Sequence, residues 1–152
     1  MDPGSTVLLL HGPNLNLLGE REPEVYGTAT LNEYVACAAD TAARYGLDVD
    51  ARQSNHEGDL IDAIHEARGR CAAIVINAGA LSHYAWSLHD ALAAFDGPIV
   101  EVHISDPTTR EEWRHTSVIE PVADVSIAGH GMRGYELALN AVGTALGREP
   151  SA

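Results

Sequence analysis

The sequence contains no lysine, because all nine of its basic residues are arginines. Lysine is the side chain that forms Schiff bases with carbonyl substrates, and it is also the residue that contacts phosphates in a P-loop. The absence of lysine therefore excludes two kinds of site: a covalent site that uses a side-chain amine, and a nucleotide site of the P-loop type.

Positive charge as a whole is scarce, since 22 acidic residues against nine arginines give a formal net charge of −13. Nucleic acids and anionic membranes attract proteins that carry clustered cations, so we predict neither as a partner. No apolar run approaches the roughly 20 residues that a membrane-spanning helix needs. The N-terminal residues lack the basic region of a signal peptide, and we expect a cytoplasmic protein.

Metal-binding and cofactor-binding patterns are also missing. The two cysteines, Cys37 and Cys71, lie in apolar or helical patterns and are predicted to be reduced, buried thiols. Eight histidines are scattered without an HExxH motif or a Cys/His cluster. No GxGxxG follows the first apolar run, and no GxSxG surrounds a serine. We therefore predict no metal and no cofactor.

What the sequence does contain is a regular alternation of short apolar runs and helical patterns within 152 residues. This length fits a single domain, 1–152, with a core over about 6–146 and a loose tail over 147–152. Alternation of this kind predicts an α/β fold with a flavodoxin-like, doubly wound parallel sheet in the order 2-1-3-4-5, with helices on both faces. The predicted strands are 6–11, 47–53, 72–77, 99–105 and 124–128, and the predicted helices are 30–45, 58–68, 82–95 and 134–146.

Polar residues gather directly after these strands, in the segments 11–27, 54–58, 77–83, 103–114 and 129–134. In an open parallel sheet the carboxyl ends of the strands lie at one edge, where ligands bind. Any one of these asparagines, histidines or arginines could have a purely structural role. Their convergence at a single edge, with Arg21 five residues before Tyr26 in a loop broken by glycine and proline, instead predicts a binding or catalytic site.

The order and spacing of five segments resemble the type II 3-dehydroquinate dehydratases, a family of small flavodoxin-like enzymes. The resemblance extends from about residue 6 to residue 146. The segments that carry it are GPNLNLLGEREPEVYG, RQSNHEGDLIDAIHEAR, IVINAGALSH, VEVHIS and GYELAL.

The resemblance implies a reaction, namely the anti elimination of water from 3-dehydroquinate to give 3-dehydroshikimate through an enolate. It is a step of shikimate synthesis and of quinate breakdown. By position, Tyr26 corresponds to the general base, His103 to the general acid, and Arg21 to the residue that supports the ionised tyrosine. A guanidinium beside a tyrosine favours the phenolate, and free tyrosine with a pKa of about 10 is otherwise a poor base at neutral pH. The resemblance assigns supporting roles to Asn14 (a water near the enolate oxygen), Glu101 (orientation of His103) and Asn77, Gly79, His83, Ile104, Ser105 and Arg114 (the substrate).

The resemblance also implies a homo-oligomer, a dodecamer built from trimers, in which Asp90 approaches the site of a neighbouring subunit. Some positions depart from the family pattern. Asp106 replaces a usual asparagine, Thr108 a usual histidine, and Tyr84 and Trp86 stand where small residues are usual. We expect a carboxylate at Asp106 to weaken the binding of an anionic substrate and to raise KM.

Two other functions share some of these sequence features. A catalytically silent paralogue could bind a cyclic hydroxy acid as a sensor, and the changes at Asp106 and Thr108 would suit it, whereas intact Arg21, Tyr26 and His103 count against it. The other function is a flavodoxin-like module that binds a nucleotide or acts as a phospho-receiver. A receiver needs a lysine after the fifth strand, and this sequence has no lysine.

Overall fold

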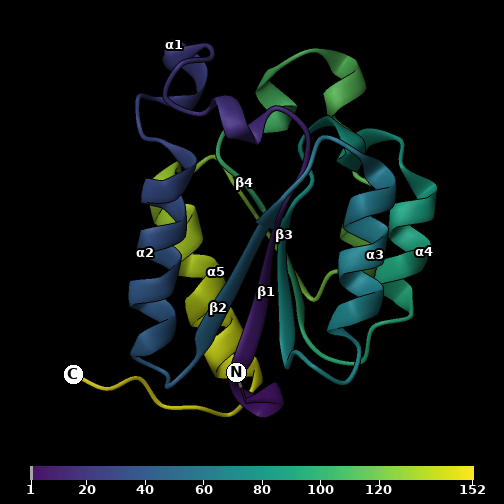
Figure 1. Cartoon of the computed structure of the whole chain (residues 1–152). Coiled ribbons are helices and arrows are strands. Elements are labelled where there is room, and N and C mark those ends of the chain that lie inside the picture. The colour runs from purple at the N-terminus through teal and green to yellow at the C-terminus, as the bar shows by residue number, and fades with distance from the viewer. Residues whose placement is uncertain (1) are drawn as a thin grey trace.

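The computed structural model describes residues 2–152, and its five parallel strands form one sheet in the order β2-β1-β3-β4-β5 (Figure 1). This is the predicted fold. Residue pairing is in register at the functional edge, where His11 lies between Gln53 on one side and Asn77 on the other. The strands are β1 (Thr6–His11), β2 (Asp48–Gln53), β3 (Ala73–Asn77), β4 (Ile99–His103) and β5 (Val125–Ala128).

Two pairs of helices cover the sheet. Helices α2 (Leu31–Ala43) and α5 (Met132–Ala145) pack on one face, and α3 (Glu57–Ala67) and α4 (Trp86–Ala93) pack on the other (Figure 1). Side chains along β1 alternate between the two layers: Val7 and Leu9 face the first pair, and Leu8 and Leu10 face the second. All four are essentially inaccessible to solvent, which explains why a central parallel strand is apolar at consecutive positions.

Local sequence signals account for some helix ends and not for others. The predicted capping box is present, since Thr30 Oγ1 accepts from the Glu33 backbone and the Glu33 carboxylate accepts from the Thr30 backbone. The prediction that a helix begins at Ser82 was wrong. The Ser82 hydroxyl donates to the Gly79 carbonyl inside a separate 3-10 helix, η3 (Gly79–His83), and α4 begins only at Trp86.

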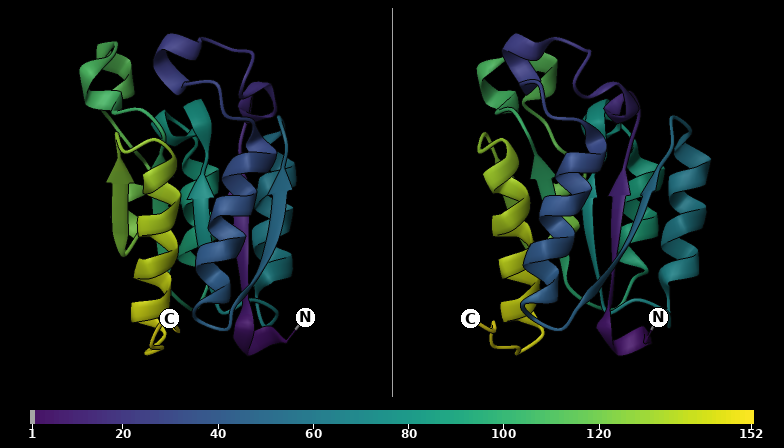
Figure 2. Two further views of the ribbon diagram at one scale, coloured as in Figure 1. Left: turned by 90° about the vertical axis from the view of Figure 1, so that its left-hand side faces the viewer. Right: turned by 60° about the vertical axis from the view of Figure 1, so that its left-hand side comes forward.

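Irregular segments rise above the carboxyl edge of the sheet. The loop after β1 contains a short helix, α1 (Pro23–Tyr26), and the segment after β4 contains two 3-10 helices, η4 (Pro107–Thr109) and η5 (Glu112–Arg114). In both views of Figure 2 these two segments lie side by side at the end of the molecule opposite the chain termini. The remaining 3-10 helices are η1 (Pro3–Ser5), η2 (Leu15–Leu17) and η6 (Glu120–Val122).

The last residues, for which the sequence predicts a loose tail, form hydrogen bonds to the rest of the chain. The Arg148 guanidinium donates to the carbonyls of Gly4, Tyr45 and Gly46, and the Ser151 backbone pairs with Arg44. Within residues 2–152, no helix has both the length and the apolar character needed to cross a bilayer.

Candidate active site

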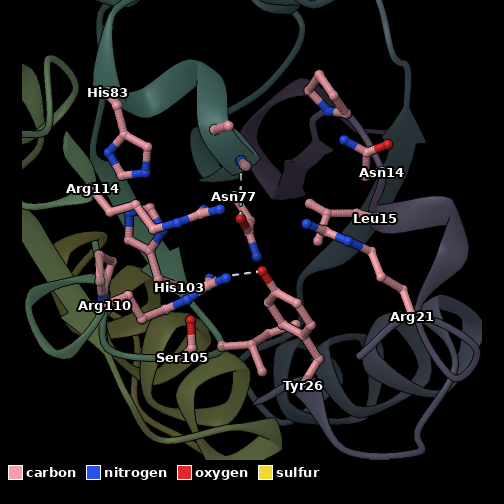
Figure 3. A pocket seen from close by; sticks show the side chains of 15 residues that line it. Asn14, Leu15, Arg21, Tyr26, Asn77, His83, His103, Ser105, Arg110 and Arg114 are labelled. Carbon is pink, nitrogen blue, oxygen red and sulfur yellow. Dashed lines mark hydrogen bonds between the residues drawn. The ribbon is translucent and has the colours of Figure 1, made fainter. Parts of the chain in front are cut away.

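A polar pocket lies at the carboxyl edge of the sheet, where the segments after β1, β3 and β4 meet (Figure 3). Its lining includes every residue that the sequence assigned to the site except Glu101 and Asp90. The lining residues are Pro13, Asn14, Leu15, Arg21, Tyr26, Asn77, Gly79, Ala80, His83, His103, Ile104, Ser105, Pro107, Arg110 and Arg114.

Two glycines allow the loops after β1 and β3 to approach each other closely enough to form the floor of this pocket. A Cβ on Gly12 would lie 2.3 Å from the Ala78 carbonyl oxygen. A Cβ on Gly79 would lie 2.9 Å from the Pro13 carbonyl oxygen, and Gly79 also has a positive φ of 60°. Any larger residue at either position would push the two loops apart.

Tyr26 lies between two arginines. Arg110 Nη1 donates to the Tyr26 hydroxyl at 2.8 Å. The guanidinium carbons of Arg21 and Arg110 lie 5.1 and 5.4 Å from the centre of the Tyr26 ring, and the two side chains reach it from opposite sides in Figure 3. Two guanidinium groups therefore lie within reach of the Tyr26 ring, and one of them contacts its hydroxyl directly.

We define the lid as residues 19–27, the segment that carries both Arg21 and Tyr26. It leaves the body of the protein at Gly19, whose positive φ of 94° and close approach to the Thr28 carbonyl suit only glycine. It is anchored at its far end by Tyr34 on α2, whose hydroxyl donates to the Tyr26 carbonyl at 3.3 Å. Within it, Glu22 has a left-handed backbone (φ 39°) just before Pro23, a strained conformation of the kind that concentrates at functional sites.

His103 is held from behind by a buried carboxylate. Its Nε2 lies 2.7 Å from Glu101 Oε2, which leaves Nδ1 for the pocket. Glu101 also accepts from the hydroxyls of Ser117 at 2.6 Å and Ser126 at 3.0 Å. Burial alone would raise the pKa of Glu101, but the hydrogen bonds from His103 and the two serines outweigh burial and lower it. An ionised Glu101 accepts a hydrogen bond from Nε2 and so fixes the orientation of the His103 ring.

His83 and Arg114 lie on the same side of the pocket as His103, across from Asn14 and Arg21 (Figure 3). His83 Nδ1 donates to the Thr116 carbonyl at 2.7 Å, so Nε2 is free to accept. Burial is the main cause that lowers the pKa of His83. The hydrogen bond to the Thr116 carbonyl opposes this change, and the charges of His103 and Arg114 lower the pKa further. Arg114 is fixed by an ion pair with Glu111 and by the Trp113 ring, whose centre lies 4.0 Å from the guanidinium carbon.

The pocket is cationic although the protein is strongly acidic. Its lining contains Arg21, Arg110 and Arg114 together with two histidines, and no aspartate or glutamate side chain. Field lines in a cleft follow the local charges rather than the net charge, so the pocket suits a small anion.

The structure adds one residue and leaves one expectation open. Arg110, which contacts Tyr26, was not singled out in the sequence, although it lies within the polar segment 103–114. Asp106 does not line the pocket. Its carboxylate accepts from the backbone and hydroxyl of Thr108 at 3.0 and 2.7 Å, whereas its neighbours Ser105 and Pro107 do line the pocket, and the expected effect on KM stays a prediction. Asp90 is exposed on α4 and contributes nothing to the pocket of its own chain.

The fold and the site define a flavodoxin-like α/β enzyme with a tyrosine–arginine pair and a histidine–carboxylate pair at the functional edge. The sequence model of the Dehydroquinase class II family matches residues 5–143, and the chain belongs to this family.

Curated relatives and solved structures agree with this membership. The chain is 56% identical to a 3-dehydroquinate dehydratase 1 of Corynebacterium efficiens over 88% of this chain and 89% of the relative. It is 51% identical to a 3-dehydroquinate dehydratase 1 of Bradyrhizobium diazoefficiens over 97% and 96%, respectively. The crystal structure of a type II dehydroquinase from Propionibacterium acnes superimposes with a TM-score of 0.88 at 42% identity, covering 95% of this chain and 99% of that one.

Proposed function

We propose that this protein is a 3-dehydroquinate dehydratase that removes water from its substrate by an acid–base mechanism through an enolate. The observation that carries the proposal is that a tyrosine hydroxyl bonded to an arginine and a histidine bonded to a carboxylate line one cationic pocket. Arg110 donates to Tyr26, Glu101 orients His103, and both reactive groups line the same cavity. Curated relatives that carry this activity by name match the chain over most of its length.

In the proposed reaction, the Tyr26 phenolate removes a proton from the carbon next to the substrate ketone. The electron pair of that C–H bond moves onto the ketone oxygen and forms an enolate, which Asn14 stabilises through a bound water. When the enolate collapses, the carbon–carbon double bond forms and the β-hydroxyl departs. His103 Nδ1 donates the proton that converts this leaving group into water. Solvent then returns one proton to His103 and takes one from Tyr26.

The remaining lining residues have roles in binding and orientation. Arg114 is the cation best held by its neighbours, so it suits the substrate carboxylate as a fixed donor. The Asn77 amide, His83 Nε2 and the Ile104–Ser105 segment suit the substrate hydroxyls, together with the backbone at Gly79. Closure of the lid would bring Arg21 and Tyr26 onto the substrate together and exclude water from the site.

The direct test is absorbance of the enone product while purified protein is mixed with 3-dehydroquinate. Wild-type protein should form the product, and Tyr26→Phe should reduce turnover by about 10³-fold or more, because the ring remains and the base is lost. Tyr84→Phe, at an exposed tyrosine outside the pocket, is the matched control and should behave like wild type.

The catalytically silent paralogue predicts a different outcome of the same experiment. Such a protein would bind a cyclic hydroxy acid, measured by calorimetry, without forming any enone. If wild-type protein turns over 3-dehydroquinate and Tyr26→Phe does so equally fast, Tyr26 is not the base and another group removes the proton.

We also propose that Asp90 serves the site of a neighbouring subunit within a dodecamer built from trimers. Support comes from its position: Asp90 is exposed on α4 and outside the pocket of its own chain. Sedimentation at micromolar concentration should show an assembly far larger than the 16.1 kDa chain, and Asp90→Asn should lower kcat in that assembly. A fully active monomer would contradict the shared site.

A further inference from the structure

Behind Asn77 lies a buried polar cluster that the proposed reaction leaves unused. The Nε2 atom of His11 lies 2.8 Å from the Tyr135 hydroxyl, and Asn77 Nδ2 donates to the same hydroxyl at 3.2 Å. None of the three side chains is more than 3% exposed. His11 ends β1, Asn77 ends β3 and Tyr135 lies in α5, so the cluster joins three elements at the floor of the site.

Donor and acceptor rules fix the direction of every proton in this cluster. The Gly79 backbone N–H donates to Asn77 Oδ1 at 3.2 Å, so the amide nitrogen must face Tyr135. An amide nitrogen only donates, so the Tyr135 oxygen accepts from it. The Tyr135 hydroxyl proton then has Nε2 of His11 as the one acceptor among its hydrogen-bond contacts in residues 2–152, and we assign the proton to that bond because a buried hydroxyl without an acceptor is costly. His11 must then be neutral, with its ring proton on Nδ1.

This arrangement leaves one buried group unsatisfied. Among residues 2–152, Nδ1 of His11 has no hydrogen-bond partner of good geometry, and the backbone of Arg52 makes at most a weak contact with the ring. A buried donor without a partner is destabilising, and its presence in a native structure calls for an explanation. An apolar residue at position 11 would avoid the unsatisfied group, but it would leave the Tyr135 hydroxyl without an acceptor and the Asn77 amide without a fixed neighbour.

The surroundings also keep His11 in the required state. Burial lowers the pKa of His11 to about 4, with the backbone of Arg52 opposing the change. Near neutral pH the ring is therefore uncharged, and Nε2 is available as an acceptor. The Tyr135 ring stacks on the imidazole at a centroid distance of 5.6 Å and an angle of 6° between the two planes, which limits reorientation of either ring.

We propose that His11 and Tyr135 are positioning residues that act through Asn77. Tyr135 holds one proton of Nδ2 and Gly79 holds one lone pair of Oδ1. The second proton and the second lone pair are then presented to the pocket in one fixed orientation, ready for a substrate hydroxyl. The proposal rests on the proposed function in one respect, which is that Asn77 contacts the substrate.

A double-mutant cycle tests this coupling. Tyr135→Phe should lower kcat/KM about tenfold in the wild-type background, the effect of losing one orienting hydrogen bond. In the Asn77→Ala background the same change should lower kcat/KM less than about twofold, because the residue through which Tyr135 acts is gone. The control is Tyr45→Phe, which removes a tyrosine hydroxyl outside the pocket. That hydroxyl donates to Asn140 Oδ1 over 2.8 Å, and its loss should leave kcat/KM unchanged.

Two variants at position 11 separate hydrogen bonding from packing. His11→Gln places a carboxamide oxygen near the position of Nε2 and should retain more activity than His11→Leu, which offers Tyr135 no acceptor. The proposal is overturned if the two position-11 variants lose activity equally. It is also overturned if Tyr135→Phe leaves kcat/KM unchanged, or if Tyr135→Phe lowers kcat/KM equally in the wild-type and Asn77→Ala backgrounds.

Neutron diffraction from deuterated crystals gives a readout that does not depend on turnover. The proposal requires a deuteron on Nδ1 of His11, none on Nε2, and the Tyr135 deuteron directed at His11. A deuteron on Nε2 would overturn it even if the enzyme turns over 3-dehydroquinate. If the deuterons lie as predicted but the protein does not turn over 3-dehydroquinate, the positioning role of His11 and Tyr135 is supported. Only the proposed substrate is then rejected.

Discussion

At the scale of the residue, Arg110 is the group whose removal tests the site most directly. It donates to the Tyr26 hydroxyl and lines the pocket. Arg110→Met keeps most of the apolar stem and removes the guanidinium. We expect kcat/KM to fall at least tenfold, which is about 1.4 kcal/mol of transition-state stabilisation.

The matched control for Arg110→Met is Arg133→Met, which removes an exposed guanidinium that pairs with Glu136 on the surface of α5. Its kcat/KM should stay within about twofold of wild type. If Arg110→Met behaved like this control, the contact with Tyr26 would have no part in catalysis.

Residue types after the strands were sufficient to predict most of the pocket, and the errors came from side-chain direction. Arg110 and Arg114 both follow β4, and only the turns of η4 and η5 decide that Arg110 reaches Tyr26 while Arg114 rests on Trp113. Asp106 is two residues before Thr108, and its carboxylate satisfies that local turn instead of facing the pocket. These choices depend on backbone angles that a single sequence does not specify.

At the scale of the element, the best predictions were those that depended on short-range signals. The capping box at Thr30 and the apolar periodicity of 31–43 lie within one helix, so the helix could be recognised without its neighbours. The order of the sheet followed from the alternation of strands and helices and from the handedness of crossovers.

Elements that tertiary contacts define were missed. Helix α1 spans four residues and shows no periodicity, and Glu22 before it has a left-handed backbone that no residue other than glycine commonly adopts. The 3-10 helix η3 occupies the start of the predicted helix 82–95, and its first residue, Gly79, lies close to the Pro13 carbonyl. Both departures belong to the site, where local preference yields to function.

At the scale of the whole molecule, the buried histidine in the central sheet makes stability depend on pH. The pKa of His11 is about 4 in the folded state against an ordinary 6.5. Between these two pH values His11 is protonated in the unfolded chain and neutral in the folded protein. The stability is fully present above pH 6.5 and is lost as the pH falls towards 4, by roughly 3 kcal/mol per chain in total. The lowered pKa of Glu101 adds a further loss at lower pH, because that carboxylate must be protonated.

Urea unfolding at pH 7 and at pH 5, at one protein concentration, measures this effect. Wild type should lose about 2 kcal/mol per chain more than His11→Gln over that interval. His65→Gln, at an exposed histidine of α3, should lose as much as wild type. Equal losses in wild type and His11→Gln would mean that His11 is not the group that titrates.

Both ends of the chain lie at the end of the molecule opposite the lid, where the Arg148 guanidinium donates to the Gly4 carbonyl (Figures 1 and 2). A carrier or affinity tag joined at either end therefore lies away from the mouth of the pocket. Because residues 1–152 contain no lysine, reagents that couple to primary amines have no side-chain target among them. Treatment with such reagents would therefore leave the lid and the three pocket arginines unmodified.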